Sequence, residues 1–287
     1  MAGLLVTSAC SDGAPAASGP SAAPGPPAQA ATLDEVEAAV TKTLATTGEL
    51  VERQVMGIGA EGTFEWTSTA DFDGPSGNYR VVTAFSADPP ELGRMLTGGS
   101  GMALEDLTTE VSRVGDKLYL TLRAWPENLR GRWLPMTLDD AATMLAGQGV
   151  QLGDDPRSPS RLLALIDSAD ATVSRAGSTF RLTVPAPEAV GVLGTAAMRM
   201  FARRQIDVEQ LTGEVSFEAV TDAQGRIESM RLDATDLMRQ IMELAGVEVP
   251  PNGLTTTIEL RLTNFGKPVS VTAPPADKLI DPAEMNR

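Results

Sequence analysis

Few side chains in this 287-residue chain could perform catalysis, because it contains no histidine. That absence excludes Ser-His-Asp and Cys-His catalysis and histidine-based zinc sites. Ser100 lies in GGSGM, but Met102 stands where a hydrolase nucleophile turn needs glycine. The pairs Asp139-Asp140 and Asp154-Asp155 are typical of solvated loops and helix starts. We expect no catalytic residue, metal or cofactor; an enzyme that uses carboxylates alone is the least favoured alternative.

Three glycines in MGIGAEG, namely Gly57, Gly59 and Gly62, have the G-x-G-x-x-G spacing of a dinucleotide-binding loop. Such a loop follows a strand and opens a helix. Here an expected helix precedes the glycines and an expected strand follows them, so we interpret them as loop glycines.

The single cysteine, Cys10, lies between the apolar run Leu4–Val6 and a polar segment. In a bacterial lipobox a small residue precedes a cysteine that is acylated; Ala9 fits, although Thr7 replaces the preferred leucine. The apolar run is shorter than that of a secretory signal peptide and no basic residue precedes it. We interpret residues 1–10 as a truncated signal and lipobox remnant, with Cys10 as the lipid-attachment site. The alternative is a stray cysteine.

Residues 11–31 consist almost wholly of alanine, proline, glycine and serine, a composition that predicts a disordered tether. Two acyl chains on Cys10 are enough for stable anchoring. We therefore expect a lipid-anchored protein of the cell envelope, on the outer face of the cytoplasmic membrane. No apolar stretch approaches the roughly 18 residues that a spanning helix needs.

The charge balance argues against nucleic acid as a partner. The chain has 23 Lys and Arg against 38 Asp and Glu, a formal net charge of −15, and the basic residues form no cluster. Nucleic-acid binding needs clustered cations that neutralise phosphates, so we expect none.

From Thr32 onward the sequence predicts a single domain, residues 32–287. Thr32 and Glu35 form a capping-box pattern at the start of a helix. Apolar and polar residues then alternate in serial hairpins, which is typical of an antiparallel sheet with one wet face. Strands are expected within 62–72, 78–85, 110–123, 171–185, 213–234 and 254–266, and helices at 137–147, 158–168, 187–204 and 235–245. Two hairpins are expected to turn at Gly115-Asp116 and Gly177-Ser178, and Leu254, Thr256, Ile258 and Leu260 share the apolar face of the last strand. Pro159 at the first helical position marks the start of the helix at 158–168. The predicted fold is α+β: a large curved antiparallel sheet with helices on its concave apolar face.

The expected helix at 187–204 is apolar on most sides and rich in glycine, alanine and methionine. Small residues leave space and methionine adapts to irregular apolar partners, so this helix could line a lipid cavity. The predicted lining residues are Trp66, Leu118, Leu120, Val192, Leu193, Ala196, Met200, Met238, Ile241 and Met242. The alternative is an ordinary filled core.

Three stretches carry a resemblance to a known family. The ending NFGKPVSVTAPPADKLID, residues 264–281, together with VGDKLYL and GRWLPM, resembles actinobacterial envelope lipoproteins of the LppX/LprG type, which are LolA-like. The resemblance implies a half-open barrel that carries a lipid or glycolipid in a cavity.

From the resemblance we expect a monomeric lipoprotein that binds or carries an acyl-chain lipid or glycolipid and has no enzymatic activity. The alternative is an anchored interaction or sensor protein whose core is filled.

Overall fold

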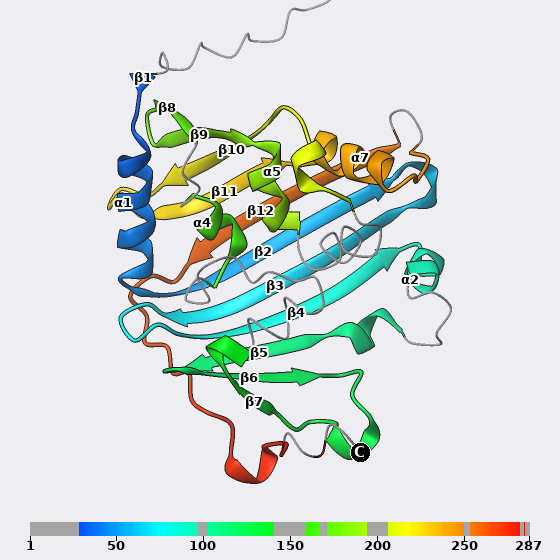
Figure 1. Ribbon diagram of the computed structural model, residues 1–287. Helices are drawn as coiled ribbons and strands as arrows, with labels where there is room; N and C mark the ends of the chain where they lie inside the picture. Colours follow the sequence, from blue (N-terminus) through cyan, green and yellow to red (C-terminus); the bar gives the residue numbers. More distant parts are fainter. Residues whose placement is uncertain are drawn as a thin grey trace, which may run out of the picture.

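The computed structural model describes residues 29–96, 103–140, 159–166, 171–193, 206–249, 253–281 and 284. The strands are β1 (Gln29–Ala30), β2 (Thr47–Ile58), β3 (Thr63–Asp73), β4 (Asn78–Asp88), β5 (Thr109–Val114), β6 (Lys117–Leu122), β7 (Leu134–Thr137), β8 (Thr172–Ala176), β9 (Thr179–Pro185), β10 (Glu214–Thr221), β11 (Ile227–Asp233) and β12 (Leu254–Thr263). They form one sheet, shown in Figure 1.

The sheet has 12 strands in the order β1-β8-β9-β10-β11-β12-β2-β3-β4-β5-β6-β7. All neighbouring strands run antiparallel. Its two edge strands, β1 and β7, do not pair with each other among the described residues, so the sheet is open. The predicted α+β class with a large antiparallel sheet is confirmed. The sheet begins at Gln29, inside the range assigned to the tether, because β1 pairs with β8.

The predicted hairpin turns are confirmed. β5 ends at Val114 and β6 begins at Lys117, so Gly115 and Asp116 form the turn. Gly115 has a φ of 63°, in the left-handed region that glycine adopts without steric cost. Gly177 has the same φ at the start of the turn between β8 and β9. These turns are local, which explains why the sequence pattern predicts them.

β2 is a strand that the sequence pattern did not predict. Its residues from Gly48 to Gln54 alternate between buried and exposed. The inward positions include Glu52 and Gln54, whereas Val51 on the outer face is 43% exposed. Because polar side chains point inward and an apolar one points outward, the usual alternation of apolar and polar residues is lost.

The helices are α1 (Leu33–Leu44), α2 (Pro90–Leu96), α4 (Arg161–Leu165), α5 (Ala186–Ala189) and α7 (Thr235–Leu244). At α1 the backbone N–H of Thr32 donates to the Glu35 carboxylate (3.4 Å), as a capping box requires. The helix predicted at 235–245 is confirmed by α7.

The helix predicted at 158–168 is wrong in its start: α4 begins at Arg161, and the Ser160 side chain accepts from the backbone N–H of Leu163 as the N-cap. The helix predicted at 187–204 is interrupted, since α5 passes into a 3-10 helix at Val190–Leu193. The rest of that prediction, and most of the one at 137–147, lies outside the described residues.

The helices cover the sheet unequally. Figure 1 shows α1, α4, α5 and α7 over the upper part of the sheet, and α1, α5 and α7 contact strands β9 to β12. Among the described helices, α2 is the one that packs on β3 and β4, at their ends. This places the main apolar core between the helices and the upper strands.

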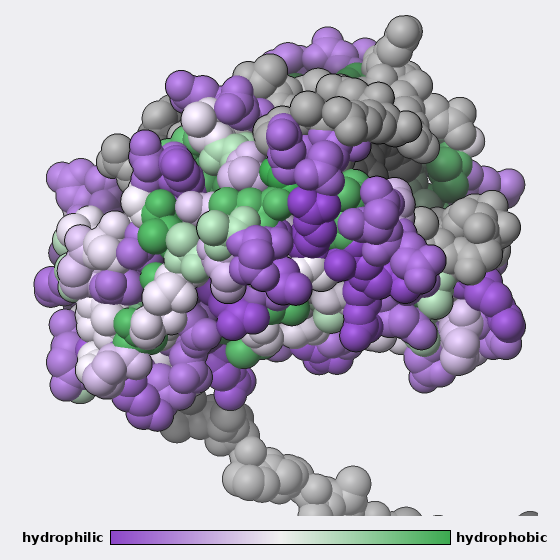
Figure 2. All heavy atoms as spheres, turned by 90° about the horizontal axis from the view of Figure 1, so that it is seen from below, coloured by the Kyte–Doolittle hydropathy of each residue, from purple (hydrophilic) through white to green (hydrophobic). Residues whose placement is uncertain are grey.

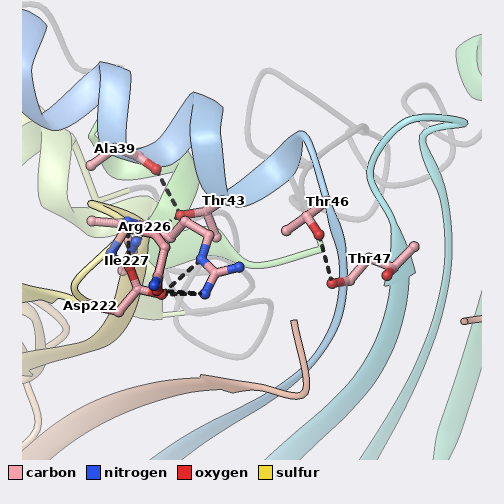
Figure 3. Close-up of polar contacts among 8 residues, drawn as sticks. Ala39, Thr43, Thr46, Thr47, Asp222, Arg226 and Ile227 are labelled. Atoms are coloured by element: carbon pink, nitrogen blue, oxygen red, sulfur yellow. Dashed lines mark hydrogen bonds and ion pairs between the residues drawn. The ribbon is translucent and has the colours of Figure 1, made fainter. Parts of the chain in front are cut away.

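Hydrogen bonds fasten α1 to the turn between β10 and β11 (Figure 3). The buried hydroxyl of Thr43 donates to the carbonyl of Ala39 (2.7 Å) and accepts from the backbone N–H of Ile227 (2.7 Å). Beside it, the Arg226 guanidinium donates to the Asp222 carboxylate (2.7 Å). This end of the sheet is therefore held by polar contacts as well as by apolar packing.

Two of the three stretches that carry the family resemblance, GRWLPM and the ending, lie side by side. Trp133 in GRWLPM forms a parallel bridge with Leu279 near the chain's ending. Its backbone N–H donates to the carbonyl of Lys278 and its carbonyl accepts from Ile280, both at 2.8 Å. Ile280 packs with Trp125 in a small second core. These stretches therefore have a structural role at the β7 edge.

Candidate functional site

The inner face of the sheet, which points toward the helices, differs along its width. We call the inner side chains of β9 to β12 the buried region. Six large apolar members of this region are each at most 3% exposed: Phe180, Leu182, Phe217, Leu232, Ile258 and Leu260. We use the term half-buried region for partly exposed apolar side chains on the inner faces of β4 to β7, which include Val81, Phe85, Val111, Leu120 and Met136. Tyr79 and Leu118 on the same faces are buried. Figure 2 views the molecule from the β7 side and shows hydrophobic residues grouped centrally, with hydrophilic residues around them.

A row of polar side chains crosses the inner face from β12 in the buried region to β5 in the half-buried region. We call it the polar stripe; its members are Thr256 on β12, Gln54 and Glu52 on β2, Ser68 on β3, Thr83 on β4 and Thr109 on β5. Glu52 lies opposite Ser68, Ser68 opposite Thr83, and Thr83 opposite Thr109. Gln54 and Thr256 are diagonal neighbours, since Gln54 pairs with Ile258. The register therefore brings together residues that are far apart in the sequence.

Some members of the polar stripe have protein partners. The Ser160 hydroxyl donates to the buried Glu52 carboxylate at 2.6 Å, a length typical of a bond to a charged acceptor. The hydroxyls of Ser68 and Thr83 are hydrogen-bonded at 2.8 Å. In contrast, both polar atoms of the Gln54 amide and the Thr256 hydroxyl have no hydrogen-bond partner in the described structure.

An aromatic cluster lies beside the polar stripe on the inner face. Its members are Phe64, Trp66 and Phe85, and the Phe64 ring centroid is 6.1 Å from that of Trp66 and 6.2 Å from that of Phe85. Trp66 lies directly opposite Gln54 on one side and Phe85 on the other. The inner face thus combines aromatic surface with neutral hydrogen-bonding groups, which can hold an amphipathic ligand.

The outer face of the sheet has a different character. Arg53 donates to both carboxylate oxygens of Glu65, at 2.8 and 2.6 Å, and these bonds hold the pKa of Glu65 below its usual value. Arg181 pairs with Glu218 on the same face. This agrees with the predicted wet outer face.

The predicted cavity residues do not form one group. Val192, Leu193, Met238 and Ile241 are at most 6% exposed and belong to the main core. Met242 packs on that core and is partly buried, and Leu118 is buried within it. Trp66 belongs to the aromatic cluster, and Leu120 to the half-buried region. Ala196, Met200 and Cys10 lie outside the described residues.

Sequence reasoning missed the polar stripe. Thr256 was placed on the inward face of its strand, but Glu52 and Gln54 were not assigned to a strand. The sequence did contain one signal for this strand: residues 47–58 have the length of a strand and lie between a helix and a turn that contains glycine.

A hollow of about 190 Å³ lies on the outer face, lined by Glu49, Asp71, Asn264 and 267–270. The Asn264 amide donates to the Glu49 carboxylate there (2.6 Å). Its lining is polar, so it is not the apolar cavity that the sequence predicts.

The described residues contain no cluster of three potential metal ligands, and none of the described helices is long and apolar enough to cross a membrane. Asp140, in one of the acidic pairs, accepts from the backbone N–H of Thr137 (3.4 Å), and its own N–H donates to the Thr137 hydroxyl (3.0 Å). This reciprocal arrangement is that of a helix start. Asp154, Asp155 and Ser100 lie outside the described residues.

The comparisons with known proteins give similarity to solved structures. No protein-family model and no curated protein matches the chain. Among solved structures, it is similar to a LolA superfamily protein from Nitrosomonas europaea, with 10% sequence identity over 86% of this chain and 97% of that chain and a TM-score of 0.26. The fold class rests on the strand order and pairing described above.

Proposed function

We propose that this protein is a non-enzymatic envelope lipoprotein of the LppX/LprG type that binds or carries an acyl-chain lipid or glycolipid on the inner face of its sheet. One observation carries the proposal: several apolar side chains on the inner faces of β4 to β7 keep exposed surface, beside the buried Tyr79 and Leu118, whereas those named for the buried region keep almost none. An acyl chain that covered this surface would gain about 25 cal/mol for each Å² removed from water.

In this proposal Cys10 is acylated and holds the chain on the outer face of the cytoplasmic membrane, with residues 11–28 as the tether. The protein acts as a monomer. It needs no cofactor, because transfer of an acyl chain from one apolar site to another makes and breaks no covalent bond.

A second function is favoured by the packing of the predicted cavity residues. Val192, Leu193 and Ile241 are fully packed in the main core. A filled core under the helices is what an anchored interaction or sensor protein would have.

Binding of a fluorescent fatty acid to the full chain with Cys10→Ser tests the first function. Phe85 in the half-buried region and Ala84 next to it face opposite sides of the sheet, since Phe85 pairs with Trp66 and Ala84 with Thr67. We expect Phe85→Ser to weaken binding several-fold, because apolar contact is lost, and Ala84→Ser to leave it unchanged. Bare protein in native mass spectrometry together with no binding of the fatty acid would remove the carrier function and leave the interaction protein.

The anchor is tested separately, in the producing bacterium. Cells fed radiolabelled palmitate should label the protein, and Cys10→Ser should abolish the label. A label that persists in Cys10→Ser would show that the acylated residue lies elsewhere.

A further inference from the structure

Two polar side chains of the polar stripe are buried without a protein partner. Gln54 is 1% exposed and Thr256 is 0% exposed, and neither the Gln54 amide nor the Thr256 hydroxyl has a hydrogen-bond partner in the described structure. A buried polar group that lacks a partner destabilises the fold, and such groups are uncommon. Two of them as diagonal neighbours on paired strands call for a functional reason.

Their chemistry is complementary to a hydroxyl group. The Gln54 amide offers both donors and an acceptor, and the Thr256 hydroxyl can donate and accept. The remainder of the stripe differs, because Glu52 is bonded to Ser160, and Ser68 to Thr83. The unmet hydrogen-bonding capacity is therefore concentrated where β2 and β12 pair.

A ligand would approach Gln54 and Thr256 along the aromatic cluster. From Gln54 the register leads to Trp66 and then to Phe85. Exposure rises along this path, from 1% at Gln54 to 9% at Trp66 and to a half-buried side chain at Phe85. A ligand whose acyl chain covered the half-buried region would therefore reach Gln54 past the Trp66 side chain, with a neighbouring polar group directed at the Gln54 amide.

Charge restricts what that polar group can be. The Glu52 carboxylate lies two residues from Gln54 on the same face, a spacing of about 7 Å along a strand. The inner faces of β12, β2, β3 and β4, all fully described, carry no lysine or arginine. A phosphate or carboxylate placed against Gln54 would be repelled by Glu52 and would find no cation on the inner faces of these four strands, whereas a neutral hydroxyl group meets neither obstacle.

We infer that Gln54 and Thr256 form a polar subsite that binds a neutral hydroxyl group next to the acyl chain of the ligand. This inference rests on the proposed lipid-binding function and narrows its ligand to uncharged, hydroxyl-bearing acyl or alkyl lipids. The hydroxyl can belong to glycerol or to a sugar, and the test distinguishes these sources.

Displacement of a bound fluorescent fatty acid by three C12 probes tests the subsite. The probes are monolauroylglycerol, dodecyl glucoside and methyl laurate, of which only the first two carry hydroxyls. We expect the full chain with Cys10→Ser to bind at least one hydroxylated probe about tenfold more tightly than methyl laurate, the effect of one good hydrogen bond. The probe that is preferred identifies glycerol or sugar as the source.

Gln54→Leu and the isosteric Thr256→Val should each reduce this preference to about twofold or less while the fluorescent fatty acid still binds. Met56→Leu, at the next inward position of β2, is the matched control and should keep the preference. A preference that is absent, or that survives in both variants, overturns the subsite but leaves the proposed function intact. Failure of the fluorescent fatty acid and, in native mass spectrometry, of all three neutral probes to bind the unaltered inner face removes the proposed function, and the subsite with it.

Discussion

Leu232 on β11 and Leu120 on β6 both point to the inner side of one sheet, yet Leu232 is 0% exposed and Leu120 is half-buried. Helices α1, α5 and α7 pack on the strands around Leu232, whereas Leu120 contacts a small core near the chain's ending. The same strand pattern thus supports a closed core in one place and partly accessible apolar surface in the other. Inward alternation alone therefore does not decide burial; the layer that covers the strands does.

The largest predicted effect is the difference in stability between alanine variants of these two leucines. Leu232→Ala should lower the free energy of unfolding by about 2–5 kcal/mol, because it leaves a cavity in a closely packed core. Leu120→Ala should lower it by about 1 kcal/mol, since the site is already partly exposed. Urea unfolding measures both. Equal losses would mean that the two regions are packed alike, and would break the comparison.

A smaller loss of stability is expected when the hydrogen bond between α1 and β11 is removed. Thr43→Val leaves the backbone N–H of Ile227 buried without its acceptor and should lower the free energy of unfolding by about 1–3 kcal/mol. Thr41→Val, at an exposed position of the same helix, should change it by less than about 0.5 kcal/mol. If both variants unfold at the same urea concentration, the Thr43 bonds do not stabilise this end of the sheet.

β2, which carries Gln54 of the polar stripe, lies between the two regions, and a substitution there should raise stability. Gln54→Leu replaces an unpartnered buried amide by an apolar group of similar size, so the ligand-free protein should gain about 1 kcal/mol. Gln240→Leu is the control, because the Gln240 amide donates to the Thr212 carbonyl (3.1 Å) and its removal should not stabilise. A loss of stability in Gln54→Leu, measured by urea unfolding, would contradict the assignment of Gln54 as unpartnered.

The smallest predicted effect is a loss of stability at acidic pH, caused by protonation of Asp222. Burial raises the pKa of Asp222, but hydrogen bonds from Arg226 and from the backbone of Gln224 lower it more, so the pKa lies below the ordinary value of 3.8. A carboxylate with a lowered pKa stabilises the fold fully above its ordinary value and loses that contribution as pH falls toward the lowered one.

The stability advantage of the unaltered protein over Asp222→Asn should therefore be greatest at pH 6 and shrink toward pH 3. Urea midpoints at the two values measure this. An advantage that grows on acidification would show that the Asp222 pKa is raised instead.

Much of the sheet was predictable from local patterns. The turns at Gly115 and Gly177 and the alternation of Leu254, Ile258 and Leu260 depend on neighbours in the chain, and the structure confirms them. The start of α4 was misplaced because Pro159 suggested an earlier first turn, whereas Ser160 serves as the N-cap and also bonds to Glu52 on β2. That second contact spans distant parts of the sequence.

The candidate site was far less predictable than the fold. The cavity list followed methionine-rich and small residues, but Met238 and Ile241 proved to be ordinary core residues. Gln54 and Glu52 escaped notice because inward polar side chains imitate a solvent-exposed segment. Only the pairing of β2 with β12 and β3 shows that they face inward.

By itself, the sequence determined the class of the fold: period-two alternation and tight glycine turns specify antiparallel hairpins, because both act over a few residues. The tertiary structure decided which hairpins lie next to each other, and hence that β12 pairs with β2 and that Thr256 meets Gln54. It also decided where the helices leave the inner face half-buried. These outcomes depend on contacts between residues far apart in the chain, whose free energies no local pattern records.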